Sequence, residues 1–110
     1  MTDAERIRKL TEWMEWEWID PLHIKDKGGY VFDGTHWNPL TRIQDVDMLE
    51  GEVFKRGLEW KYVPALIKVI HGPHTKYHDL TVRGVWFLIR ATPEQRCAAI
   101  EALMEDKCKQ

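Results

Sequence analysis

Three histidines lie close together in the second half of the chain, and an aspartate directly follows the last of them. Imidazole rings at such short spacing can converge on a transition metal ion. A Gly-Pro pair follows the first histidine, and these two residues break the helix that would align the rings. The alternative interpretation is therefore a solvated polar loop. The candidate metal ligands are His71, His74 and His78, with Asp79 beside them, and no cofactor is expected.

The segment 12–20, EWMEWEWID, places three indoles among four carboxylates. Tryptophan dominates many protein interfaces, and acidic surroundings attract a basic partner. The alternative is that the rings belong to the core and the carboxylates only keep the helix soluble. We predict a protein-binding face made of Trp13, Trp16, Trp18, Glu12, Glu15, Glu17 and Asp20.

Three further tryptophans fall in or next to segments that we predict to form a sheet. Between a sheet and a helix, such rings could stack on a nucleotide-type molecule, with Arg or Lys at the mouth to hold phosphate. An ordinary aromatic core is the more frequent outcome for buried tryptophans. The residues of this alternative ligand site are Trp37, Trp60 and Trp86.

The sequence lacks the motifs of common enzymes. It contains no serine, no GxSxG, no phosphate loop and no HExxH. Cys97 falls on an amphipathic helix, where a thiol is inert rather than activated. Direct nucleic-acid binding is also disfavoured, because the formal charge is −2 and the cations of the second half are scattered. We expect a protein that is not an enzyme.

Capping signals predict three helices that would position these residues. The first runs from about residue 3 to 17 and begins with Thr2 and Glu5, which fit a capping box. The second begins near Thr41, which fits a capping box with Gln44. It ends before Gly57, which can adopt the left-handed conformation of a helix end. The third begins at residues 92–95, TPEQ, which combine a cap with a first-turn proline.

Strands are predicted between these helices. A tight hairpin is expected to pivot on Asp33-Gly34, because β-type residues flank this turn signal. Alternating or continuous apolar patterns predict further strands at 58–62, 66–70 and 82–90. The order of elements is helix, two strands, helix, three strands, helix. It favours an α+β fold with a mixed or antiparallel sheet of four to five strands and three helices packed on it.

Composition is consistent with one domain over residues 1–110, with an acidic, Trp-rich helix at 1–20 and a core at 22–106. Of 110 residues, 44% are hydrophobic and 31% charged, as in ordinary globular proteins. Residues 1–60 carry a net charge of −5 and residues 61–110 one of +3. No apolar run is long enough to span a membrane and no signal peptide begins the chain, so we expect a cytoplasmic protein.

The segment GGYVFDGTHWNP, the Thr-led helix that ends in glycine, and the final ATPEQRCAAIEALMED together resemble the phage αβα-sandwich domain family. The resemblance covers about residues 28–106 and implies a phage or prophage origin and a sandwich fold, without an assigned activity. The matching residues are Trp37, Pro39, Pro93, Glu94, Cys97, Ala98, Ala99 and Leu103.

The combined interpretation is a small phage accessory protein that acts by binding. It would inhibit or modulate a host protein, in the manner of anti-defence or anti-CRISPR proteins, through its acidic, Trp-rich surface. A host enzyme that binds nucleic acid would offer a suitably basic surface, and the excess of tryptophan also allows a homodimer. The alternatives are sequestration of a nucleotide-type molecule in an aromatic pocket and a structural or assembly role.

Overall fold

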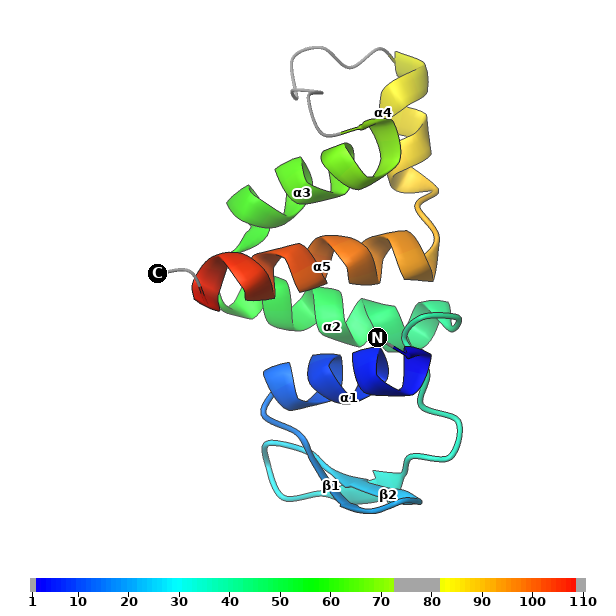
Figure 1. Ribbon diagram of the computed structural model, residues 1–110, viewed down its shortest axis with the longest axis vertical. Coiled ribbons are helices and arrows are strands. Elements are labelled where there is room, and N and C mark those ends of the chain that lie inside the picture. Colours follow the sequence, from blue (N-terminus) through cyan, green and yellow to red (C-terminus); the bar gives the residue numbers. More distant parts are fainter. Residues whose placement is uncertain (1, 73–81, 109–110) are drawn as a thin grey trace.

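Helices make up most of the chain, and a small antiparallel sheet covers one end (Figure 1). The computed structural model describes residues 2–72 and 82–108. Its elements are α1 (Asp3–Trp13), β1 (Glu17–Asp20), β2 (His23–Lys25), β3 (Val31–Asp33), α2 (Ile43–Lys55), α3 (Glu59–His71), α4 (Val82–Ile89) and α5 (Pro93–Cys108). The expected α+β class is therefore confirmed, although the described residues form five helices and three strands.

The elements are stacked along the long axis of the molecule. Figure 1 shows α1 between the sheet and a layer formed by α2 and α5, with α3 beyond that layer and α4 at the far end. Helix α5 packs against α1, α2 and α3. It contributes Cys97 and Ile100 to the core, both without exposed surface. The predicted capping box at its start is present, because Thr92 and Gln95 exchange hydrogen bonds of 2.9 and 3.1 Å.

The sheet runs in the order β1-β2-β3, and its register puts one row of side chains towards the core. Trp18 pairs with Ile24, which in turn pairs with Phe32. Side chains alternate between the two faces of a strand, so these three share the inner face. Gly34 follows β3 under the same row, where an added Cβ would lie 2.7 Å from Cγ1 of Ile24.

The predicted hairpin pivot at Asp33-Gly34 is wrong. The turn between β2 and β3 instead covers residues 26–30, where the Asp26 carboxylate accepts hydrogen bonds of 2.9 Å from the backbone N–H groups of Gly28 and Tyr30. Gly29 has a φ of 93° at this turn, a conformation that glycine adopts without steric cost. The Gly-Gly pair therefore forms the turn, and Asp33 ends the strand.

The predicted strands at 58–62, 66–70 and 82–90 are also wrong, because these segments form α3 and α4. Short apolar runs do not distinguish a strand from a buried helix. The helical signal is that Leu58, Tyr62, Leu66 and Ile70 recur every four residues, and all four lie against or within the core. Pro64 lies inside α3 without ending it.

The two N-terminal helices differ in detail from their predictions. Thr2 caps α1 through a 3.2 Å hydrogen bond from the Glu5 backbone N–H, but the helix ends at Trp13 rather than near residue 17. Helix α2 follows the N-cap residue Arg42, whose side chain makes no capping hydrogen bond, so the pair expected at Thr41 does not cap it. Gly57 takes the predicted left-handed conformation, with a φ of 69°.

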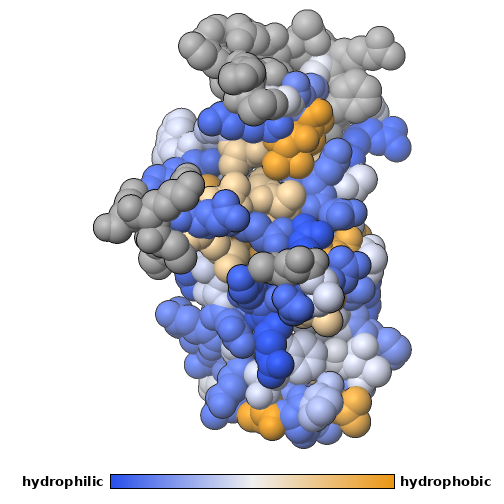
Figure 2. Space-filling model, in the orientation of Figure 1, coloured by the Kyte–Doolittle hydropathy of each residue, from blue (hydrophilic) through white to orange (hydrophobic). Residues whose placement is uncertain are grey.

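The surface in Figure 2 is mostly hydrophilic, with hydrophobic atoms near the top, over α3 and α4, and in smaller spots at the sheet end. Val85 and Ile89 of α4 are among the exposed apolar side chains. No helix in the described part of the chain combines the length and apolar character needed to cross a bilayer.

An aromatic pocket between the sheet and helix α2

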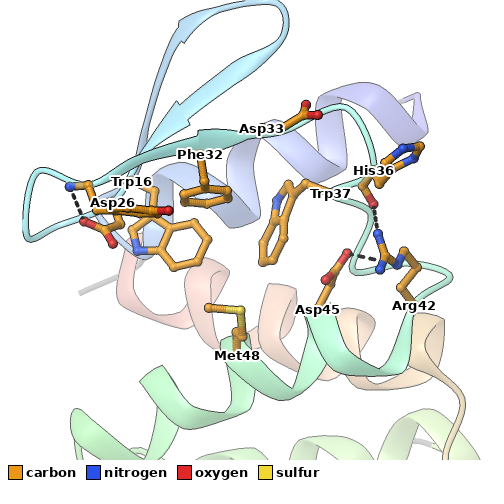
Figure 3. Close-up of a pocket in the computed structure, with 10 residues that line it drawn as sticks. Trp16, Asp26, Phe32, Asp33, His36, Trp37, Arg42, Asp45 and Met48 are labelled. Carbon is orange, nitrogen blue, oxygen red and sulfur yellow. Dashed lines mark hydrogen bonds and ion pairs between the residues drawn. The ribbon is translucent and has the colours of Figure 1, made fainter.

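A hollow of about 370 Å³ lies between β3, the loop that follows it, and α2. Figure 3 shows three rings along the sheet side of this pocket, with a methionine pointing towards them from α2. The rings belong to Trp16, Phe32 and Trp37, and the methionine is Met48. We call this hollow the aromatic pocket. It joins side chains from three separate segments of the chain.

The Trp16 ring contacts both of the other rings, at different inclinations. The centroid of Trp16 lies 5.3 Å from that of Phe32, at an interplanar angle of 81°, and 5.1 Å from that of Trp37, at 45°. Edge-to-face and tilted pairs are favoured arrangements of aromatic rings. The wall of the pocket is therefore a set of inclined faces rather than a flat stack.

Trp37 is the most firmly held of the three rings. It is only 8% exposed, and its indole Nε1–H donates to the Thr11 hydroxyl at 2.8 Å. The Thr11 hydroxyl donates in turn to the Ile7 carbonyl at 2.6 Å. A buried N–H with a partner fixes the ring orientation, so helix α1 positions the inner wall of the pocket.

Three carboxylates also line the aromatic pocket. Asp26 belongs to the β2–β3 turn, Asp33 to the end of β3 and Asp45 to α2. One guanidinium, that of Arg42, lies near them, 3.8 Å from Asp45 and 2.7 Å from the carbonyl oxygen of His36. Carboxylates thus outnumber guanidiniums by three to one.

Each of these carboxylates also accepts hydrogen bonds from a neighbouring turn or loop. Asp45 accepts the Asn38 backbone N–H at 2.8 Å and is almost fully buried. Asp33 accepts from the hydroxyl and the backbone N–H of Thr35. These bonds hold the pKa of Asp33 below its ordinary value, so this group is ionised at neutral pH. The loops therefore fix negative charge beside the aromatic rings.

Two further hollows adjoin the aromatic pocket. One, of about 400 Å³, shares Trp16, Asp26 and Met48 with it and continues along α2 to Lys55. The other, of about 490 Å³, has a polar lining and shares His36 and Arg42 with the aromatic pocket. Its remaining lining residues are Thr35, Asn38 and Thr41. The three hollows together form a groove with an apolar, acidic middle and a cation towards each end, Arg42 at the polar end and Lys55 at the other.

The predicted protein-binding face does not present its three indoles together. Trp13, Trp16 and Trp18 are each partly buried against the core. Trp13 lies under the Arg56 guanidinium, whose centre is 4.2 Å from the ring. Arg56 also donates a hydrogen bond to the backbone carbonyl of Trp13. Of the three, only Trp16 lines the aromatic pocket.

The carboxylates predicted with these indoles lie at the surface. Glu12 is 3.5 Å from Arg8, and Glu15 is 3.0 Å from Lys27. Asp20 is 3.0 Å from His23, and Glu17 is exposed at the start of β1. Because an indole points inward wherever a carboxylate points outward, this segment serves partly as core, and its acidic groups form the outer surface.

The predicted ligand trio does not line one pocket. Trp37 lines the aromatic pocket, but Trp60 on α3 is 84% exposed and Trp86 on α4 is 54% exposed, and neither is among the residues lining that pocket. The guanidinium of Arg90 lies over the Trp86 ring at 5.6 Å. The prediction is wrong for these two tryptophans because it places them in strands, whereas they lie on helices α3 and α4.

Of the predicted metal ligands, only His71 lies within the described residues. It ends α3, and its Nε2 is 3.1 Å from the carbonyl oxygen of Gly84. His74, His78 and Asp79 lie outside the described residues. Within residues 2–72 and 82–108, no group of three or more histidine, cysteine or acidic side chains could hold a metal ion.

Several pocket residues were not anticipated, namely Tyr30, Phe32, Met48 and Arg42. A signal was present for Phe32, because the aromatic residues Tyr30 and Phe32 alternate across a segment bounded by turn residues. Nothing in the sequence pairs that segment with α2. The approach of Met48 depends on how the helix packs against the sheet.

Comparisons of the chain with protein-family models, curated proteins and solved structures found no match. The resemblance to the phage αβα-sandwich family therefore stays a prediction.

Proposed function

We propose that this chain is a binding protein that holds a basic segment of a partner protein in the aromatic pocket. The proposal rests mainly on one observation: three inclined rings and three carboxylates line the same hollow. Aromatic faces attract cations through their quadrupole, and carboxylates attract them by charge. A protruding cationic side chain suits both features.

The wider charge distribution supports the same partner. Every residue that lines the aromatic pocket belongs to residues 1–60, which carry a net charge of −5. An acidic surface of this kind speeds the encounter with a basic protein and disfavours acidic ones. In a phage accessory protein, the partner would be a host factor in the cytoplasm. A nucleic-acid-binding enzyme is the natural candidate, because its own substrate site is basic.

Binding of the host factor should depend on residues at the rim of the pocket. Trp16 and Trp18 are poor choices for substitution, because both pack against the core. Tyr30 is 69% exposed and lines the pocket, so Tyr30→Ala removes contact area at little cost to folding. Trp60 is more exposed still and lies outside the pocket, so Trp60→Ala is the matched control.

The experiment is affinity capture from host lysate with the wild-type chain and these two variants, followed by measurement of the affinity of the captured protein. Tyr30→Ala should reduce that affinity, whereas Trp60→Ala should leave it unchanged. The interaction should also weaken as salt is added, because attraction between exposed charges is screened. Equal affinities for all three chains would contradict the proposal.

A nucleotide-type ligand is the second candidate, and the polar hollow next to the aromatic pocket favours it. Arg42, His36 and Thr41 line that hollow, and such groups bind phosphate. A base stacked on the rings would then place its phosphate beside Arg42. The variant Arg42→Gln separates the candidates: it should abolish nucleotide-induced thermal stabilisation, but should not weaken the binding of a basic protein.

A further inference from the structure

We infer that the aromatic pocket recognises a methylated ammonium group, rather than a bare ammonium or a guanidinium. The inference rests on the proposed function, because it names the cationic group that the pocket would accept. The preference follows from the hydrogen bonds that the pocket walls offer to a cation.

The rings offer charge-attracting faces but few hydrogen-bond acceptors. Phe32 has no polar side-chain atom, and the indole N–H of Trp37 already donates to Thr11. The Met48 sulfur is at most a weak acceptor. A lysine ammonium carries three N–H donors and arginine five, each of which needs an acceptor once water is removed. A trimethylammonium group carries the same charge with no donor, so this wall suits it better.

The carboxylates supply negative charge while accepting hydrogen bonds from the turn and loops around the pocket. Asp26 binds the turn through backbone N–H groups, Asp33 binds Thr35, and Asp45 binds the Asn38 N–H. These bonds hold the carboxylates in place, and those of Asp26 and Asp33 occupy only Oδ1, so the charge of each attracts a cation among the rings. The same three charges disfavour a phosphate in the middle of the groove.

The opening of the pocket is consistent with a ligand that enters from solvent. Tyr30 and Met48 are both at least half exposed while lining the hollow. Because these two side chains lie at the rim and Trp37 lies at the buried end, a cation can reach the inner ring faces without a change in the fold.

The probes are choline, its neutral isostere with carbon in place of nitrogen, and the capped amino acids trimethyllysine and lysine. Each is titrated into the full chain at constant ionic strength, while NMR follows the Trp37 indole N–H and the Met48 methyl group. Choline or trimethyllysine should shift these signals saturably. The neutral isostere should bind at least about tenfold more weakly, because it lacks the cation–π attraction.

The matched variants are Asp26→Asn and Asp20→Asn. The first keeps the side-chain oxygen that accepts the turn N–H groups but removes the charge beside the rings, and should weaken choline binding about threefold or more. Asp20 lies outside the aromatic pocket, so Asp20→Asn should bind choline like the wild type. Phe32→Leu should also weaken binding, with circular dichroism to show that the fold is retained.

The outcomes distinguish the source of the cation and separate this inference from the proposed function. Tighter binding of trimethyllysine than of choline indicates a modified lysine in a protein, and the reverse indicates a free quaternary amine. If capped lysine binds as tightly as trimethyllysine, or if no methylated cation shifts the pocket signals, the inference is wrong. The proposed function then still stands if capture of a basic host protein depends on Tyr30, and falls if it does not.

Discussion

Replacement of Thr11 by valine tests whether α1 holds the inner wall of the aromatic pocket. Thr11 has no exposed surface, and its hydroxyl is the acceptor for the indole N–H of Trp37 at 2.8 Å. Valine has nearly the same shape but no oxygen. The indole N–H would remain buried without a partner, which costs about 1–3 kcal/mol. We therefore expect Thr11→Val to lower the free energy of unfolding by about 2 kcal/mol.

A double-mutant cycle with Trp37→Phe isolates the contribution of this hydrogen bond to stability. Phenylalanine has no N–H, so in that background Thr11→Val strands no donor and should cost less than about 0.5 kcal/mol, since removing both partners is nearly neutral. The coupling energy between the two positions should be about 1.5 kcal/mol. Urea-induced unfolding followed by far-ultraviolet circular dichroism is the suitable assay, because its signal does not depend on the tryptophan removed.

Thr11→Ser serves as the control, because it keeps the accepting oxygen and removes one methyl group. It should cost about 0.8 kcal/mol, the burial energy of that group, with either residue at position 37. If Thr11→Val costs the same in both backgrounds, the hydrogen bond does not hold the indole and our account of the pocket wall is wrong. NMR of the Trp37 N–H in Thr11→Val should also show a changed chemical shift.

Three further predictions concern packing, thiol reactivity and pH. Gly34→Ala should destabilise the fold by about 1–3 kcal/mol, because the added Cβ would overlap side chains on the inner face of the sheet. Gly51 lies on an exposed face of α2 with open space around it, so Gly51→Ala should stabilise the fold by about 0.5–1 kcal/mol. Urea unfolding measures both changes. Burial raises the pKa of Cys97 to about 12, so in a Cys108→Ser background iodoacetamide should alkylate the thiol at pH 8 only when the chain unfolds. Hydrogen bonds from Thr35 lower the pKa of Asp33 below its ordinary value of 3.8, so the ionised carboxylate stabilises the fold above that pH. Asp33→Asn should therefore be less stable than the wild type at neutral pH. In acid-titrated thermal melts the difference should vanish as the pH falls through the pKa of Asp33 in the folded chain.

Local signals in the sequence predicted three of the helix termini correctly. The caps at Thr2 and Thr92 and the left-handed Gly57 depend on residues three or four apart, so the chain specifies them without reference to the rest of the fold. The Asp33-Gly34 turn failed because Gly28-Gly29 provides a competing turn. Which turn closes the hairpin depends on the register that points Ile24 inward.

The largest error came from apolar runs of intermediate length. The segment LIKVI contains β-branched residues typical of strands, yet it belongs to α3, because Leu66 and Ile70 continue a four-residue repeat that faces the core. Tertiary packing against α5 therefore overrides β propensity there. The four-residue repeat runs through the whole of segment 58–70, across Pro64, and over that length it favours a helix.

The candidate site could be predicted only in part. The sequence indicates Trp16 and Trp37 for different sites. In the structure their ring centroids are 5.1 Å apart. Their meeting requires the sheet to fold back over α1, and Met48 joins only because α2 packs beneath. Contacts between distant segments of this kind have no local signature.

The central position of α5 has a consequence for how the chain is made. Helices α1, α2 and α3 all pack on this segment, which the ribosome synthesises after them. Until the residues around Ile100 leave the exit tunnel, the apolar faces of the earlier helices lack the surface of α5 that covers them in the folded chain. The nascent chain should therefore stay sensitive to protease until α5 has left the exit tunnel, and then become resistant in a single step.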